Sequence, residues 1–171
     1  ASGRVLAVAP LGASSTARVA CAETQAVSVD TLGARPDDGV DDTAVLQQAI
    51  NMAPAGTTFV FPAGVYQISA LLLPRSDLTL CASSTATLRW TGGSGHLIDA
   101  AYRGRADRFN LYNLVFDGAS VILAGSGNRV VNNTFRNVNR PGTALESDHT
   151  RMHALHIVGF EDGVIEHNVF D

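Results

Sequence analysis

The sequence predicts an all-β protein in which short strands stack coil upon coil, a parallel β-helix. When the segments YNLVFDG, VNNTFRN and HALHIVG are set one above another, Phe116, Phe135 and Ile157 fall into one column, at steps of 19 and 22 residues. Stretches such as LTL, TATLRW and VIEHNVF alternate apolar and polar residues and are separated by Gly, Asn and Asp. Coils of this length, each burying one side chain on the next, are typical of a solenoid.

Composition limits the classes of protein and partner. The 171 residues are 46% hydrophobic and 16% charged, which fits one globular domain. A formal net charge of -4, with twelve basic residues that are all arginine, argues against a nucleic-acid partner. The longest apolar run, residues 70–74, is far shorter than the roughly 20 residues that cross a bilayer, so we expect no membrane span.

We expect residues 1–22 to be an ordered N-terminal extension and residues 23–171 to be the β-helix domain. The only cysteines are Cys21 in the extension and Cys81 in the domain. In an exported protein they could form a disulfide that ties the extension to the body, and two buried thiols are the alternative.

The stretch DDGVDDT places Asp37, Asp38, Asp41 and Asp42 within six positions. Calcium favours clustered carboxylates, but this spacing does not match a calcium loop. As the start of a helix the stretch fits well, because acids there cap free N–H groups, and the apolar residues that follow recur with helical spacing. We therefore predict a helix over about residues 42–53 and coils from about residue 57. Calcium remains the one cofactor that the sequence leaves open.

The segment from Val27 to Ser69 resembles the opening of the pectate-lyase-like, right-handed parallel β-helix proteins. The matching residues are Gly33, Ala34, Asp38, Gly39, Asp41, Asp42, Thr43, Phe61, Pro62, Ala63, Gly64 and Tyr66. The resemblance implies a right-handed solenoid whose N-terminal amphipathic helix covers the first coil. It does not fix the reaction, because lyases, hydrolases, epimerases and phage tailspikes share this opening.

The chain ends at Asp171, inside a predicted coil, where strand edges and apolar interior would be uncovered. We expect either a longer protein of which this is the N-terminal part, or an oligomer formed through the open C-terminal end. Members of the resembled family usually carry their catalytic residues in middle coils.

Four of the five histidines, including His149, lie in the last 23 residues. Chemistry on an acidic polysaccharide requires a group that neutralises the uronate carboxylate and groups that move protons. The stretch GTALESDHTRMH loosely resembles a coil of alginate C5-epimerases, although the Asp-Pro-His core of their motif is missing. The catalytic candidates are Glu146, Asp148, His149 and Arg151.

Two further histidines, His153 and His156, are three residues apart in a predicted strand. Because side chains alternate along a strand, we expect the two rings on opposite faces.

Three arginines in AYRGRADRF, namely Arg103, Arg105 and Arg108, are candidate substrate-binding residues, because guanidinium groups bind carboxylates bidentately. An ordinary solvated loop is the alternative. Trp90 and Tyr102 could stack on sugar rings. We expect Asn132, Asn133 and Asn168 to form a ladder at the turns.

The sequence as a whole favours a secreted or periplasmic carbohydrate-active β-helix protein. Its expected partner is a polysaccharide, in particular a polyuronate, changed by β-elimination or C5 epimerisation; glycoside hydrolysis is a third chemistry of the class. The alternative is a non-catalytic module that binds polysaccharide, such as an adhesin or part of a tailspike.

Overall fold

The computed structural model describes residues 17–93, 95–138 and 153–171. One α-helix, α1 (Thr43–Met52), and one short 3-10 helix, η1 (Val29–Leu32), accompany the strands in this part of the chain. The strands are β1 (Ala26–Ser28), β2 (Thr58–Phe61), β3 (Gly64–Ile68), β4 (Thr79–Trp90), β5 (His96–Ala100), β6 (Asn110–Asp117), β7 (Ser120–Ser126), β8 (Arg129–Val131), β9 (Thr134–Arg136), β10 (Leu155–Glu161), β11 (Val164–Glu166) and β12 (Val169–Phe170).

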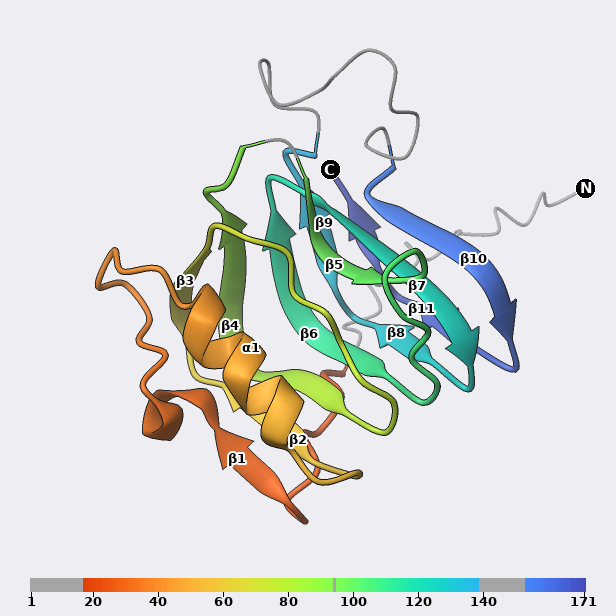
Figure 1. The fold of residues 1–171 in the computed structure, drawn as a ribbon, viewed down its shortest axis with the longest axis horizontal. Helices are drawn as coiled ribbons and strands as arrows, with labels where there is room; N and C mark the ends of the chain where they lie inside the picture. The colour runs from red at the N-terminus through yellow and green to blue at the C-terminus, as the bar shows by residue number, and fades with distance from the viewer. Residues whose placement is uncertain (1–16, 94, 139–152) are drawn as a thin grey trace, which may run out of the picture.

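All the strand pairs are parallel, and they form three rows (Figure 1). The first row runs β1-β2-β4-β6-β8-β11. The second row contains β3, the C-terminal halves of β4 and β6, β9 and β12. The third sheet runs β5-β7-β10. Such stacking of parallel strands, coil after coil, agrees with the predicted parallel β-helix.

The core runs along the stack, between the rows, and a phenylalanine column marks it. The ring of Phe135 stacks on Phe116 at 5.0 Å and on Phe170 at 5.2 Å between centroids. The pairing of Phe116 with Phe135 is therefore confirmed, but the third member predicted for the column is wrong. Ile157 instead pairs with Leu123 in the third sheet.

The column was misjudged because the coils differ in length. Asn110 pairs with Arg129, a step of 19 residues, whereas Arg129 pairs with Val164, a step of 35 residues. For the same reason Arg129–Val131 does not lie over residues 151–153, as the sequence alignment suggested. The second predicted column includes Ala144, which lies outside the described residues.

The helix α1 begins at Thr43, within one residue of the predicted start. Its buried residues Leu46 and Ile50 belong to the hydrophobic core, and Figure 1 shows it beside the earliest strands. Asp42 occupies the N-cap position without a side-chain capping bond, so capping by Asp42 is wrong. Asp41 does accept the Thr43 N–H, at 3.1 Å. That the helix covers the first coil remains a prediction.

The clustered aspartates bind backbone N–H groups along β3. Val65 N–H donates to Asp37 at 3.0 Å, Gln67 N–H to Asp42 at 3.2 Å, and Ser69 N–H to Asp41 at 3.2 Å. These are alternate residues on the edge of β3 that faces away from its strand partner β4. The carboxylates thus occupy an edge that would otherwise present free N–H groups. Within the described residues, no group of three or more His, Cys, Asp or Glu could hold a metal ion.

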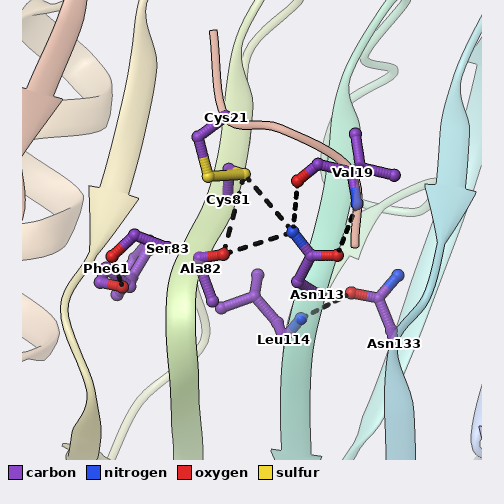
Figure 2. Close-up of a disulfide and its surroundings, with 9 residues drawn as sticks. All are labelled: Val19, Cys21, Phe61, Cys81, Ala82, Ser83, Asn113, Leu114 and Asn133. Atoms are coloured by element: carbon purple, nitrogen blue, oxygen red, sulfur yellow. Dashed lines mark hydrogen bonds between the residues drawn. A yellow bond between two sulfur atoms is a disulfide. The ribbon is translucent and has the colours of Figure 1, made fainter. Parts of the chain in front are cut away.

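The N-terminal extension is fixed to the body through a disulfide between Cys21 and Cys81 (Figure 2). Asn113 forms two hydrogen bonds with Val19: it accepts the Val19 N–H at 3.1 Å and donates to the Val19 carbonyl at 2.8 Å. Asn132 donates to the Ala17 carbonyl at 3.0 Å. Residues 17–21 therefore run along the stack and contact three successive coils.

The turn asparagines form a ladder, as predicted. Asn133 donates to the Asn168 side chain at 3.1 Å, and Asn168 donates to the Val130 carbonyl at 2.7 Å. Asn132 adopts a left-handed backbone conformation with φ of 59°, which asparagine tolerates better than most residues. These amides replace the backbone bonds that the corners cannot make.

A row of charges crosses the outer surface of the second row. Arg89, Asp117 and Arg136 are aligned by strand register, and each guanidinium lies 3.3 Å from the Asp117 carboxylate. Burial alone would raise the pKa of Asp117, but the Asn137 hydrogen bond and the two arginines hold it below its ordinary value. Asp117 is thereby kept as an anion.

No helix among the described residues is long and apolar enough to span a membrane.

Candidate functional site

The outer face of the third sheet brings together polar side chains from coils far apart in sequence. Strand register aligns Asp99 of β5, Ile122 of β7 and His156 of β10. Their neighbours Val121 and Leu123 point into the hydrophobic core. Because side chains alternate along a strand, Asp99, Ile122 and His156 lie on the opposite face. We call this surface the third-sheet face.

Asp99 shapes the loop that follows β5. Its side chain is 3% exposed as part of a buried residue, and it accepts the backbone N–H groups of Ala101 at 2.9 Å and Tyr102 at 2.8 Å. An aspartate that binds the two N–H groups after it fixes a tight turn. The turn places Tyr102 and Arg103 at the end of the strand, where both are exposed.

Three rings gather beside this turn. The Tyr102 ring lies 6.2 Å from the His156 ring, and the His156 ring lies 5.6 Å from the His153 ring. Tyr102 is 61% exposed. The prediction that His153 and His156 point to opposite faces is wrong, because β10 begins only at Leu155 and His153 precedes it. Strand alternation therefore does not apply between the two histidines.

His156 retains a nitrogen for chemistry. Its Nδ1 atom is buried and has no hydrogen-bond partner in the described structure. A buried polar atom without a partner is uncommon in folded proteins and is often found at sites that bind a ligand. The neutral ring offers one acceptor and one donor nitrogen, so it can accept or release a proton near neutral pH.

The three predicted substrate-binding arginines do not form one cationic surface. Arg108 pairs with Asp77, its Nη2 atom 2.9 Å from the carboxylate, and this bond lowers the pKa of Asp77. Arg105 pairs with Asp107 at 3.0 Å. Arg103 is exposed and forms no ion pair within the described ranges. Of the three, Arg103 presents the most available charge, and a role for any of them in binding remains a prediction.

The four predicted catalytic residues, Glu146, Asp148, His149 and Arg151, lie outside the described residues. Their roles stay predictions. Sequence analysis singled out Tyr102 but missed its pairing with His156, and it missed Asp99 altogether. Aligning IDA of β5 with VIL of β7 and LHI of β10 would have placed Asp99 and His156 in one column.

Comparison with known proteins supplies the context for this face. A family model described as rhamnogalacturonase A/epimerase, pectate lyase-like, matches residues 26–170. An exo-poly-alpha-D-galacturonosidase from Dickeya chrysanthemi is 31% identical over 121 residues, which make up 70% of this chain and 19% of that protein. The chain thus spans about a fifth of the length of this curated relative.

Two solved structures share the fold. ORF18 of Geobacillus virus E2 superposes with a TM-score of 0.57 at 22% identity, over 67% of this chain and 26% of that one. A protein from Parabacteroides merdae, assigned provisionally as a glycosyl hydrolase, gives a TM-score of 0.53 at 13% identity, over 84% of this chain and 75% of that one. At such identities the likeness concerns the fold alone.

Proposed function

Because the chain belongs to the rhamnogalacturonase A/epimerase, pectate lyase-like family, we propose that it acts on an acidic polysaccharide and contacts that chain through the third-sheet face. The observation that carries the proposal is the cluster of Tyr102, His153 and His156 beside the unpaired Arg103. The curated relative named for a poly-galacturonic acid supports galacturonate as the sugar.

The four side chains supply complementary contacts to a uronate. An exposed tyrosine ring gives a flat apolar surface against which a sugar ring can stack. The Arg103 guanidinium can bind a sugar carboxylate through two parallel hydrogen bonds. The imidazoles of His153 and His156 can exchange protons with hydroxyl groups or with the carbon next to the carboxylate.

For the reaction we propose β-elimination or C5 epimerisation. Both begin with removal of the C5 proton, and both are aided when a cation neutralises the neighbouring carboxylate. In this scheme Arg103 binds the carboxylate, and the unpartnered Nδ1 of His156 is the acceptor closest to it on this face. Hydrolysis would instead need two carboxyl groups flanking the bond, and on this face Asp99 is committed to its turn.

We further propose that the protein is secreted or periplasmic. Disulfides persist in oxidising compartments and are rare in the cytosol, and Cys21 and Cys81 are joined. A polysaccharide substrate outside the cell agrees with this location.

The test is to titrate the protein with polygalacturonate and with the neutral polymer galactan. We expect the acidic polymer to bind, and the variant Arg103→Gln to bind it about tenfold more weakly, because a charge-assisted pair is lost. Tyr102→Ala should weaken binding of both polymers. The matched control is Arg105→Gln, since Arg105 lies in the same loop but is already paired with Asp107.

Turnover is measured separately from binding. Formation of an unsaturated uronate product reports elimination, and exchange of the C5 proton with solvent deuterium reports epimerisation. We expect His156→Gln to abolish either signal while binding persists. Binding without any turnover in the wild-type protein would favour the non-catalytic module, and equal binding by Arg103→Gln and Arg105→Gln would exclude the proposed contact face.

A further inference from the structure

A polar pocket of about 230 Å³ lies at the corner between the first and second rows, near the turn that joins β8 to β9. Arg18, Asn132, Thr134 and His167 supply its polar lining. We propose that this pocket binds a single uronic acid residue. It is separate from the third-sheet face, so the inference goes beyond the proposed function and does not depend on the reaction assigned there.

The N-terminal extension supplies the charge of the pocket. Arg18 stands between Ala17 and Val19, whose backbone groups bond to Asn132 and Asn113 on successive coils. Both flanking residues are thus fixed, and Arg18 is held over the corner. Its side chain donates one hydrogen bond, to Thr85 at 3.2 Å. A guanidinium carries five N–H donors, so most of them remain for a ligand.

Asn132 supplies an acceptor that no described group satisfies. Asn113 and Asn132 occupy equivalent left-handed corners, with φ of 61° and 59°. The Asn113 amide is bonded through both its oxygen and its nitrogen to Val19. The Asn132 amide is bonded only through its nitrogen, and its Oδ1 atom is buried without a partner. An unsatisfied buried acceptor favours a ligand that brings a hydroxyl donor.

These groups together select a sugar acid. The Arg18 guanidinium calls for an anion, ideally a carboxylate that it can bind through two hydrogen bonds. The Asn132 oxygen, the Thr134 hydroxyl and the His167 ring call for neighbouring hydroxyl groups. The volume is below the roughly 300–1,000 Å³ of sites for drug-sized ligands, which limits the occupant to about one sugar ring. A uronic acid presents a carboxylate and several hydroxyls on a single ring.

The probe is D-galacturonate, titrated into the whole protein and followed by calorimetry and by amide NMR shifts. We expect saturable binding with shifts at residues 132–134 and 167. Arg18→Gln should weaken it about tenfold, the effect of one charge-assisted pair. D-galactose, which has the same ring without the carboxylate, should bind as weakly to the wild-type protein as to Arg18→Gln. Thr134→Val and His167→Asn should each weaken galacturonate binding, and asparagine keeps the left-handed turn at position 167.

Two further arms make the result decisive. Arg103→Gln should leave this binding unchanged, so failure of the proposed polysaccharide face and failure of the pocket are distinguishable. Reduction of the Cys21–Cys81 disulfide should lower the wild-type affinity toward that of Arg18→Gln and leave Arg18→Gln unaffected. The proposal is overturned by absence of saturable binding up to about 10 mM galacturonate. It is also overturned if Arg18→Gln and Thr134→Val bind as the wild type does.

Discussion

Asp117 shows how one buried residue can remain charged between coils. It is 2% exposed, and the guanidinium groups that flank it are each a little over one-third exposed. Burial is the largest influence on the pKa of Asp117 and would raise it. The hydrogen bond from Asn137 and the charges of Arg136 and Arg89 outweigh burial, so the pKa is lowered.

Replacing Asp117 with Asn should therefore destabilise the fold in a pH-dependent way. We expect the free energy of unfolding to fall by about 1–3 kcal/mol at neutral pH, because charge-assisted bonds to a buried acceptor are weakened. A carboxyl whose pKa is lower in the folded than in the unfolded state stabilises the fold above its unfolded value of 3.8, and this contribution is lost as the pH falls through the folded value.

Urea unfolding of both proteins at neutral pH and near about pH 3 measures this dependence. The difference between wild type and Asp117→Asn should shrink at the lower pH. Asp162→Asn, at an exposed left-handed turn position, is the control. A difference of the same size at both pH values would contradict the interpretation.

At the scale of an element, the edge of β3 is closed by side chains rather than by a strand. Asp42 accepts the N–H groups of Gln67 at 3.2 Å and Arg35 at 3.0 Å. Burial, together with the nearby Asp38 and Asp41 charges, raises the pKa of Asp42 despite these bonds. The carboxylate is thus useful for its oxygen atoms and is partly opposed by its own charge.

Two substitutions separate these contributions. Asp42→Ala should lower the free energy of unfolding by about 2 kcal/mol, since two backbone donors lose their acceptor. Asp42→Asn keeps one acceptor oxygen and removes the buried charge, so its loss should be smaller. Hydrogen exchange at Gln67 should accelerate in the alanine variant and much less in the asparagine variant. Equal effects would show that the acceptor oxygens are not what holds this edge.

The sequence allowed the elements to be predicted better than their stacking. The helix start, the phenylalanine pair and the asparagine ladder follow from local patterns, which do not depend on coil length. The assignment of Ile157 failed because the coil between Arg129 and Val164 is 35 residues long and passes through the third sheet. Register across coils is set by how much chain each turn contains, and periodicity alone does not reveal that.

The candidate site was predictable only in part, for a related reason. Tyr102 attracted attention as an exposed aromatic residue of the right kind for sugar binding. Its proximity to His156 depends on Asp99, which bends the chain after β5 through two backbone hydrogen bonds. A single aspartate at the end of an apolar strand gives no hint of the partner that its turn will position.

At the scale of the whole molecule, the disulfide closes a long segment. Cys21 and Cys81 are separated by 60 positions, which include the helix and the earliest strands. In the chain-entropy model a crosslink of this span stabilises a protein by up to about 4 kcal/mol. We expect reduction, or the variant Cys21→Ser, to lower the melting temperature by several degrees.

Thermal unfolding with and without reductant provides the measurement. The reduced wild type and Cys21→Ser should melt together, and reductant should not change the variant. If the wild type melts at the same temperature in both conditions, the extension contributes no stability through its crosslink.

The course of residues 17–21 has a consequence for how the stack comes apart. In a solenoid each coil contacts only its neighbours, so coils can unfold one at a time from an end. Here Cys21, Val19 and Ala17 bind the coils of Cys81, Asn113 and Asn132 in succession. Opening any one of these coils disturbs the attachment of the other two. These three coils should therefore exchange their amide hydrogens as a single cooperative unit, whereas the coil of β11 and β12 should open independently and first.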